Sequence, residues 1–182
     1  MRDKETLCAC RYNTPLGGAV ATAKGANISG FWFIGQKYFP RTTIFWTERP
    51  DLPVFISLRL WLESYFAGAN PALDIAVTPD GTPFQKMVWD ILKRISYGKV
   101  RTYGSIAGQI AASRGPASMS AQAVGGAVGR NPVSLLIPCH RVIASDGSLA
   151  GYAGGIDKKK ALLRLEQADF TIRYSILEAS KG

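Results

Sequence analysis

Apolar residues recur along this chain at two spacings, one that suits strands and one that suits helices. Residues 6–34 follow the strand pattern. Within them, Gly17 to Ala23 and Asn27 to Ile34 are separated by Lys24-Gly25-Ala26, which has glycine at a turn position. The pattern therefore predicts a β-hairpin near the start of the chain.

Helical spacing follows between Pro53 and Phe66. Proline suits the first turn of a helix, and Gly68 can end one. Apolar side chains fall at i, i+4, i+7, i+8 and i+11 along one stripe: Val54, Leu58, Trp61, Leu62 and Tyr65. We predict a helix here, then a loop at Ala69-Asn70-Pro71 and a short strand from Leu73 to Val77.

The second half of the chain is predicted to be mainly helical. Thr82 and Gln85 have the spacing of a capping box, in which each side chain bonds the backbone amide of the other residue. Further helices are expected from Thr102 to about Ala112, from Ser120 to Val128 and from Asp157 to Ala168. The first two of these make a helix-turn-helix candidate, a pattern that many helical hairpins share.

An apolar run from Val133 to Ile137 predicts a strand before the last helix. A turn is expected at Ser145 to Ser148, and a loop of flexible backbone at Gly151 to Gly155. We therefore predict an α+β protein with two domains. Residues 1–78 would form a small structural sheet-plus-helix domain, and residues 79–182 a mainly helical domain.

Charge separates the two halves. The whole chain has a net charge of +9. Residues 1–80 hold 8 Lys and Arg against 7 Asp and Glu, whereas residues 81–182 hold 14 against 6. A basic half beside a nearly neutral one favours a polyanionic partner for the C-terminal half, although a basic surface also serves solubility alone.

The cysteines favour neither a disulfide framework nor a metal site. There are three of them, and Cys8 and Cys10 are too close in sequence for an ordinary bridge. Zinc would need two more soft ligands, and only Cys139 and His140 remain. We predict core or strand positions for Cys8 and Cys10, and no metal or cofactor.

No stretch of the chain resembles a membrane or export signal. Apolar runs such as Phe31 to Ile34 are far too short to cross a bilayer. Met1 to Glu5 carries both charge signs, and no apolar run follows it. We expect a soluble, cytoplasmic protein.

Candidate chemistry centres on Cys139. Pro138 has a fixed φ and biases Ile137 toward an extended conformation, so we expect the thiol to leave a strand at a defined angle. His140 is the only histidine in the chain. A nearby cation or helix N-terminus can lower the pKa of a thiol from about 8.5 to roughly 3.5–7.5. On these residues alone, a thiol beside a histidine by chance is an equal alternative.

The residues around Cys139 belong to a longer pattern. It comprises Gly81-Thr82-Pro83-Phe84-Gln85, Val88-Trp89, Tyr97-Gly98, Tyr103, Ala123-Val124-Gly125, Asn131-Pro132, Pro138-Cys139-His140-Arg141-Val142, Gly151-Tyr152, Gly154-Gly155, Lys159, Leu162-Leu163 and Glu166. This pattern resembles the signature of the O6-alkylguanine-DNA alkyltransferases over residues 81–168. Before residue 75, only the length and Tyr65-Phe66-Ala67-Gly68 are similar.

The resemblance implies transfer of an alkyl group from O6-alkylguanine to Cys139. It implies that His140 takes the thiol proton and that Glu166 orients His140. A glutamate among helix leucines is more often solvated, unless a cationic or imidazole partner holds it. The resemblance further implies that Tyr103 donates a hydrogen bond to the base and that Asn131 props the active-site loop.

The resemblance also implies contact with DNA and with a flipped-out base. The positions that it assigns to this contact are Gln85, Gln122, Ala123, Gly125, Arg141, Ser145, Tyr152, Ala153 and Lys159. Gln122 opens the recognition helix, where relatives usually carry an arginine that fills the gap in the base stack. Glutamine can hydrogen-bond the orphaned base but brings no charge.

The expected product is a thioether, which the same site cannot hydrolyse, so each molecule would act once. The expected partner is double-stranded DNA with alkylated bases, and the protein is expected to be a monomer. Two other classes stay open. A cysteine hydrolase could use Cys139, His140 and Glu166 on acyl substrates, and it would turn over. A non-catalytic helix-turn-helix protein could bind lesions without transfer, but the presence of Cys139 argues against it.

Overall fold

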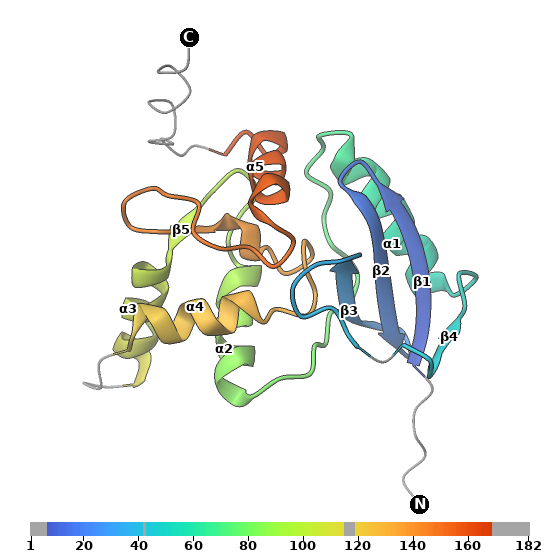
Figure 1. Cartoon of the computed structure of the whole chain (residues 1–182), viewed down its shortest axis with the longest axis horizontal. Helices are drawn as coiled ribbons and strands as arrows, with labels where there is room; N and C mark the ends of the chain where they lie inside the picture. Colours follow the sequence, from blue (N-terminus) through green and yellow to red (C-terminus); the bar gives the residue numbers. More distant parts are fainter. Residues whose placement is uncertain (1–6, 42, 115–118, 169–182) are drawn as a thin grey trace, which may run out of the picture.

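The computed structural model describes residues 7–41, 43–114 and 119–168. The segment Met1 to Glu5, whose sequence indicates no export signal, lies outside the described residues. A four-stranded sheet comes first (Figure 1). Its strands are β1 (Leu7–Thr14), β2 (Gly17–Lys24), β3 (Asn27–Phe33) and β4 (Trp46–Glu48), in the order β3-β2-β1-β4. β2 is antiparallel to β1 and β3, and β4 is parallel to β1. The predicted hairpin is confirmed, with Gly25 at φ 57° in its turn.

Helix α1 (Pro53–Phe66) packs against this sheet (Figure 1). Its apolar stripe enters the same core as the strands, and Leu58 is fully buried. The Tyr12 hydroxyl of β1 donates to the Phe55 carbonyl of α1 at 3.0 Å. Gly68, at φ 87°, follows the end of the helix. The predicted helix and both of its boundaries are confirmed.

The described residues of the second part of the chain are mainly helical, and Figure 1 draws their helices from green to red. They are α2 (Pro83–Lys93), α3 (Tyr103–Arg114), α4 (Ala121–Gly129) and α5 (Ile156–Leu165). The predicted capping box of α2 is present: Thr82 Oγ1 accepts from Gln85 N at 3.2 Å, and Gln85 Oε1 accepts from Thr82 N at 2.9 Å. Trp89 Nε1 donates to Ala127 O at 2.9 Å and ties α2 to α4.

The helix-turn-helix pair is α3 and α4, which pack against each other. Ser120 caps α4, because its Oγ accepts from Gln122 N at 3.1 Å. Part of the loop between the helices, residues 115–118, lies outside the described residues. β5 (Arg101–Thr102) pairs in parallel with β6 (Val142–Ile143), which brings the start of α3 next to the chain that follows Cys139.

Two predicted strands are wrong. Leu73 to Val77 makes a single bridge, from Val77 to Ile28 of β3, and Val133 to Ile137 makes a single bridge, from Val133 to Phe31. In the second segment the backbone turns at Leu135, which has φ 72°. Both segments lie along the edge of β3. Positions that pack against a sheet are apolar whether the backbone there is extended or turned, so the apolar pattern did not distinguish the two.

One hydrophobic cluster joins the sheet, α1 and the helical part, with Phe31, Leu58, Val88 and Ile137 among its members. The α+β prediction is confirmed, with the sheet and α1 before residue 79 and α2 to α5 after it. Within the described ranges, no helix is both long enough and apolar enough to span a bilayer.

Candidate active site

The site is built on the turn between α4 and β6. Ser134 N donates to Phe31 O at 2.8 Å, so β3 holds the start of this segment. Pro138 has φ −77° and ψ 62°, an inverse γ-turn, and the Cys139 amide donates to the carbonyl two residues before it at 2.7 Å. The thiol therefore leaves a turn and begins a short 3-10 helix, η1 (Cys139–Arg141), rather than a strand.

Asn131 organises the turn from the end of α4. Its Nδ2 lies 2.8 Å from Ile137 O and 3.1 Å from Cys139 Sγ, and its Oδ1 accepts from Val133 N at 2.9 Å. The side chain is buried. Its amide thus satisfies backbone groups that a strand would have paired and donates a hydrogen bond to the sulfur.

His140 is fully buried beside Glu166. Its Nε2 lies 2.8 Å from Glu166 Oε1, and neither side chain is exposed. An ionised carboxylate only accepts hydrogen bonds, so Nε2 carries the hydrogen in this pair and Nδ1 is the proton acceptor of the neutral ring. Within the described part of the chain, Nδ1 has no hydrogen-bond partner.

Three further residues hold Glu166. Arg141 donates from Nε to Oε2 and from Nη2 to Oε1, both at 2.8 Å, which makes a bidentate pair. The Tyr65 hydroxyl donates to Oε1 at 2.6 Å, and Gly98 N donates to Oε2 at 3.4 Å. Glu166 is only 2% exposed, so the solvated alternative is excluded.

Burial and hydrogen bonding decide the charge of this pair. Burial acts to raise the pKa of Glu166, but hydrogen bonds and charges from His140 and Arg141 outweigh it and hold that pKa well below its usual range. Burial lowers the pKa of His140, although Glu166 acts to raise it. The resting site therefore contains an ionised carboxylate beside a neutral imidazole.

The Cys139 thiol is protonated in this resting state. Burial raises its pKa, and the Asn131 hydrogen bond and the charge of Lys159 oppose that effect only in part. The side chain is 4% exposed. The lowered thiol pKa that a neighbouring cation suggested is therefore wrong for the resting protein, because desolvation is the larger effect. Reaction at Cys139 requires a base.

The other two cysteines lie on β1, as predicted, and neither is in a disulfide: Cys8 is half-buried and Cys10 is buried. Among the described residues, no group of three or more His, Cys, Asp or Glu side chains could hold a metal ion.

Comparison with known proteins decides the family. A family model described as "6-O-methylguanine DNA methyltransferase, DNA binding domain" matches residues 83–168. A methylated-DNA–protein-cysteine methyltransferase of Haemophilus influenzae is 38% identical over 160 residues, which span 87% of this chain and 86% of that protein. One of Methanosarcina acetivorans is 46% identical over 155 residues, which span 85% of this chain and 95% of that protein. The chain belongs to the methylated-DNA–protein-cysteine methyltransferase family.

A solved structure from the same family agrees in fold. Mycobacterium tuberculosis OGT, crystallised in complex with DNA, matches with a TM-score of 0.78 and 38% identity, covering 88% of this chain and 92% of that one. The match therefore extends over the sheet as well as the helical part.

Tyr103, which the methyltransferase resemblance assigns to the base, stands at the start of α3. Its hydroxyl donates to Ala150 O at 3.1 Å. Its ring lies 3.8 Å from the place that a Cβ on Gly125 of α4 would take, which is ordinary contact. Burial raises the pKa of Tyr103 to about 12, so its hydroxyl keeps its proton at neutral pH.

The loop after β6 lies against the histidine. The Tyr152 ring meets the His140 ring edge-on, with 6.4 Å between centroids. Ala153 O accepts from Lys37 N at 2.9 Å, so the N-terminal part also holds this loop. Ser145 lies in the predicted turn and is exposed.

Two residues that the resemblance assigns to DNA contact bond groups of the protein itself, and the Arg141 side chain is only 12% exposed. Lys159 is fully buried, and its Nζ donates to Val142 O at 2.5 Å and to Ala150 O at 2.8 Å. Burial lowers its pKa to about 8. Arg141 donates to Glu166 and, through Nη1, to Ile95 O at 2.6 Å. In this structure both anchor the site from within.

The remaining assigned residues lie nearer the surface. Gln122 and Ala123 are exposed on the first turn of α4, and Gly125 is half-buried on the same helix. Gln85 is half-buried, and its side chain is used in the capping box of α2.

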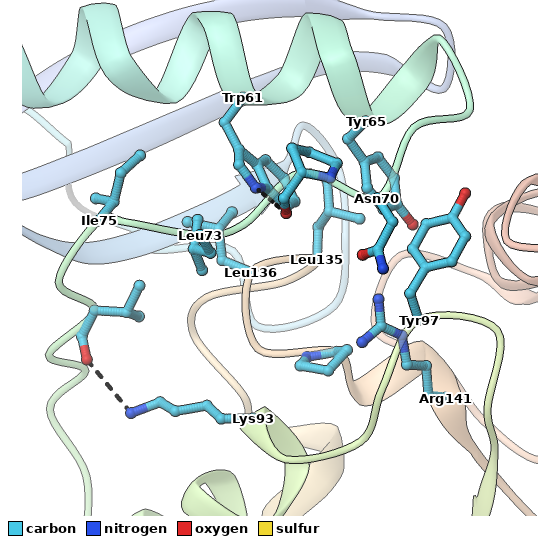
Figure 2. A pocket seen from close by; sticks show the side chains of 13 residues that line it. Trp61, Tyr65, Asn70, Leu73, Ile75, Lys93, Tyr97, Leu135, Leu136 and Arg141 are labelled. Atoms are coloured by element: carbon cyan, nitrogen blue, oxygen red, sulfur yellow. Dashed lines mark hydrogen bonds between the residues drawn. The ribbon is translucent and has the colours of Figure 1, made fainter.

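Sequence reasoning missed Tyr65 as a site residue. It counted Tyr65 in the apolar stripe of α1 and in the family-like segment Tyr65-Phe66-Ala67-Gly68, without a role in the site. Its partner Glu166 is 101 residues away, so no spacing in the sequence signals the contact. Tyr65 and Arg141 line a cavity of about 310 Å³ between α1, residues 70–77 and the active-site turn. Figure 2 shows Tyr65, Tyr97 and Arg141 at the same end of that cavity.

Proposed function

We propose that this protein transfers a methyl or other alkyl group from O6 of guanine in DNA to Sγ of Cys139, once per molecule. The observation that carries the proposal is a buried thiol that Asn131 hydrogen-bonds, followed by an imidazole bound to Glu166. Attack on an sp³ carbon suits a soft sulfur nucleophile better than a hydroxyl. The relatives' names, methylated-DNA–protein-cysteine methyltransferase, describe the same chemistry.

The reaction balances within named groups. His140 Nδ1 takes the thiol proton, and Glu166 stabilises the imidazolium that forms. A bond then forms between Sγ and the alkyl carbon while the bond from that carbon to O6 breaks, and the electron pair stays on guanine. The guanine anion gains a proton through the Tyr103 hydroxyl, and water restores the proton to Tyr103. The His140 imidazolium gives its proton to water, so one proton has moved from sulfur to guanine overall. The thioether product is stable to water.

Mass spectrometry tests this proposal. After incubation with excess duplex DNA that contains O6-methylguanine, the intact protein should gain one methyl group, on the peptide that contains Cys139. A second addition of substrate should add nothing more, since the acceptor is used up. A protein that stays unmodified and turns over an acyl substrate would be a hydrolase, and one that binds the DNA without gaining mass would be a lesion-binding protein. Either result contradicts the proposal.

We infer that DNA lies along α4. The exposed positions on this helix include Ala123 and Gly126, and small residues allow a nucleic-acid backbone to approach closely. The net positive charge of residues 81–182 attracts phosphates without reading sequence. The damaged nucleotide must leave the stack to reach a buried thiol, at a cost of a few kcal/mol.

Gln122 is proposed to fill the gap that the flipped nucleotide leaves. Replacing it with alanine should slow repair of duplex DNA far more than repair of single-stranded DNA, where little unstacking is needed. Gln122→Arg should repair duplex DNA at least as fast as the parent, because arginine can also fill the gap. The measurement is the single-turnover transfer rate on both substrates.

Gln109→Ala is the matched control for Gln122, since it removes an exposed glutamine from the neighbouring helix α3. It should change the two rates equally or not at all. Equal losses on both substrates for Gln122→Ala, or no loss, would leave Gln122 as a surface residue.

We also propose a cytoplasmic location. Cys8, Cys10 and Cys139 form no disulfide, and cysteines stay in the reduced state in reducing compartments. Fractionation of cells that express the protein tests this, and recovery outside the cytoplasm would contradict it.

A further inference from the structure

Tyr65 reaches the active site from the N-terminal part of the chain. It lies in the last turns of α1, is 1% exposed, and places its hydroxyl 2.6 Å from Glu166 Oε1. A donor at this distance from an ionised carboxylate makes a short, charge-assisted hydrogen bond. α1 therefore supplies a polar contact to a site whose other residues come from the second half of the chain.

Tyr65 and His140 share one acceptor atom. Glu166 Oε1 accepts from the Tyr65 hydroxyl and from His140 Nε2, at 2.6 and 2.8 Å. A hydrogen bond to an anion draws charge from the acceptor atom, so each donor weakens the bond that the other donor makes. The Tyr65 hydroxyl thus limits how strongly Glu166 stabilises a protonated His140.

Orientation of Glu166 does not depend on Tyr65. The bidentate pair with Arg141 fixes the plane of the carboxylate, since Nε and Nη2 bond its two oxygens at 2.8 Å each. Gly98 N donates to Oε2 as well. What the Tyr65 hydroxyl adds is a competing donor on the oxygen that faces the imidazole.

We propose that Tyr65 is a positioning residue of the alkyl-transfer site, through which the N-terminal part of the protein sets how readily His140 takes the thiol proton. The role of His140 rests on the proposed function. The contact between Tyr65 and Glu166 does not, since it is present in the protein without DNA.

Other titratable groups surround this pair and stay in place when Tyr65 is altered. Those that face Glu166 or His140 are Arg141 of η1, Lys159 of α5, Tyr97 after α2, and Tyr152 of the loop after β6, with Cys139 next to His140 in the chain. Tyr97 is the closest comparison with Tyr65. It lines the same end of the cavity (Figure 2), but its hydroxyl donates to Leu165 O at 3.1 Å, with Gly68 O at 3.4 Å.

The test is Tyr65→Phe, which removes the hydroxyl and keeps the ring stacked on Trp61 at 5.1 Å. Because His140 is the only histidine, its ring resonances can be observed without ambiguity in ¹⁵N-histidine-labelled full-length protein. The Nε2 hydrogen should move downfield, as its bond to Glu166 strengthens. The pH at which the His140 ring is half-protonated should rise by about one unit. That shift corresponds to the loss of one hydrogen bond to the charged Glu166.

Tyr97→Phe is the control and should leave both His140 signals unchanged. An unchanged or upfield Nε2 hydrogen in Tyr65→Phe overturns the proposal, as does an equal shift in the two variants. A purely structural role would lower the melting temperature without moving His140. These readouts need no substrate, so a protein that fails to accept a methyl group would refute the proposed function and leave this test intact.

Discussion

Replacing Cys139 with serine should abolish methyl transfer from O6-methylguanine DNA. The hydroxyl has nearly the same shape, so the bond from Asn131 and the turn at Pro138 can persist. A serine hydroxyl is a far weaker nucleophile toward carbon, and its proton is much harder for His140 to remove. Intact mass after a long incubation with methylated duplex DNA measures the effect, and no methyl gain is expected.

Cys8→Ser is the matched control, because it makes the same change at a half-buried thiol on β1. It should accept one methyl group at the parent rate. Both variants should retain binding to duplex DNA in a mobility-shift assay, since neither residue lies on the exposed side of α4. A methyl group on Cys8 or Cys10, or full transfer by Cys139→Ser, would refute Cys139 as the acceptor.

Replacing Glu166 with glutamine should slow transfer by about 10²–10⁴-fold while DNA binding persists. Glutamine keeps the size of the side chain but cannot stabilise the imidazolium of His140. The thiol pKa should rise as well, because its proton has a weaker acceptor. Single-turnover rates and the pH dependence of Cys139 labelling by a small alkylating reagent measure the two effects.

Stability should fall in the same variant. Glu166 accepts from Tyr65, His140 and Arg141, and an amide nitrogen in place of one oxygen would face donors. Loss of one partner from a buried ion pair costs about 3–5 kcal/mol. Because comparison is made at equal folded fraction, judged by circular dichroism, instability does not obscure the rate.

The pH dependence of stability gives an independent check on Glu166. Its pKa is depressed in the folded protein, so the stability that it contributes is present above the pKa of an unfolded glutamate, about 4.3, and is lost as pH falls below that value. The unfolding free energy of Glu166→Gln should therefore fall less than that of the parent as the pH is lowered below that value.

Glu63→Gln is the matched control, since it makes the same change at an exposed position on α1. It should transfer at the parent rate and unfold in acid like the parent. A Glu166→Gln protein with a parent rate from roughly pH 6 to 9, a range that spans the ordinary pKa of a thiol, about 8.5, would remove Glu166 from the mechanism.

Several features of the fold follow from short stretches of sequence. The turn at Gly25 needs a positive φ, and the capping box at Thr82 and Gln85 needs only two side chains three residues apart. Helix α1 likewise follows from its apolar stripe between Pro53 and Gly68. Each of these choices depends on neighbours in the chain, so reading the chain in order was enough to predict them.

Other features depended on what lies across the core. Val133 to Ile137 is buried and the apolar side chains of Leu73 to Val77 are half-buried, but one bridge each to β3 replaces the predicted strands. Asn131 explains the second case, because its amide bonds backbone groups that a neighbouring strand would have paired. Apolar residues in a segment predict that it packs against the core, but they do not predict whether its backbone is a strand or a turn.

The sequence by itself determined the family pattern over the second half of the chain and, within it, the proposed reacting group, Cys139, next to His140. Only the tertiary structure decided the protonation states of the site residues and which distant side chains they contact. Burial raises the thiol pKa and encloses Lys159, and the fold carries Tyr65 to Glu166 across 101 residues. Desolvation and such distant contacts are properties of the packed interior, and no local pattern of residues specifies them.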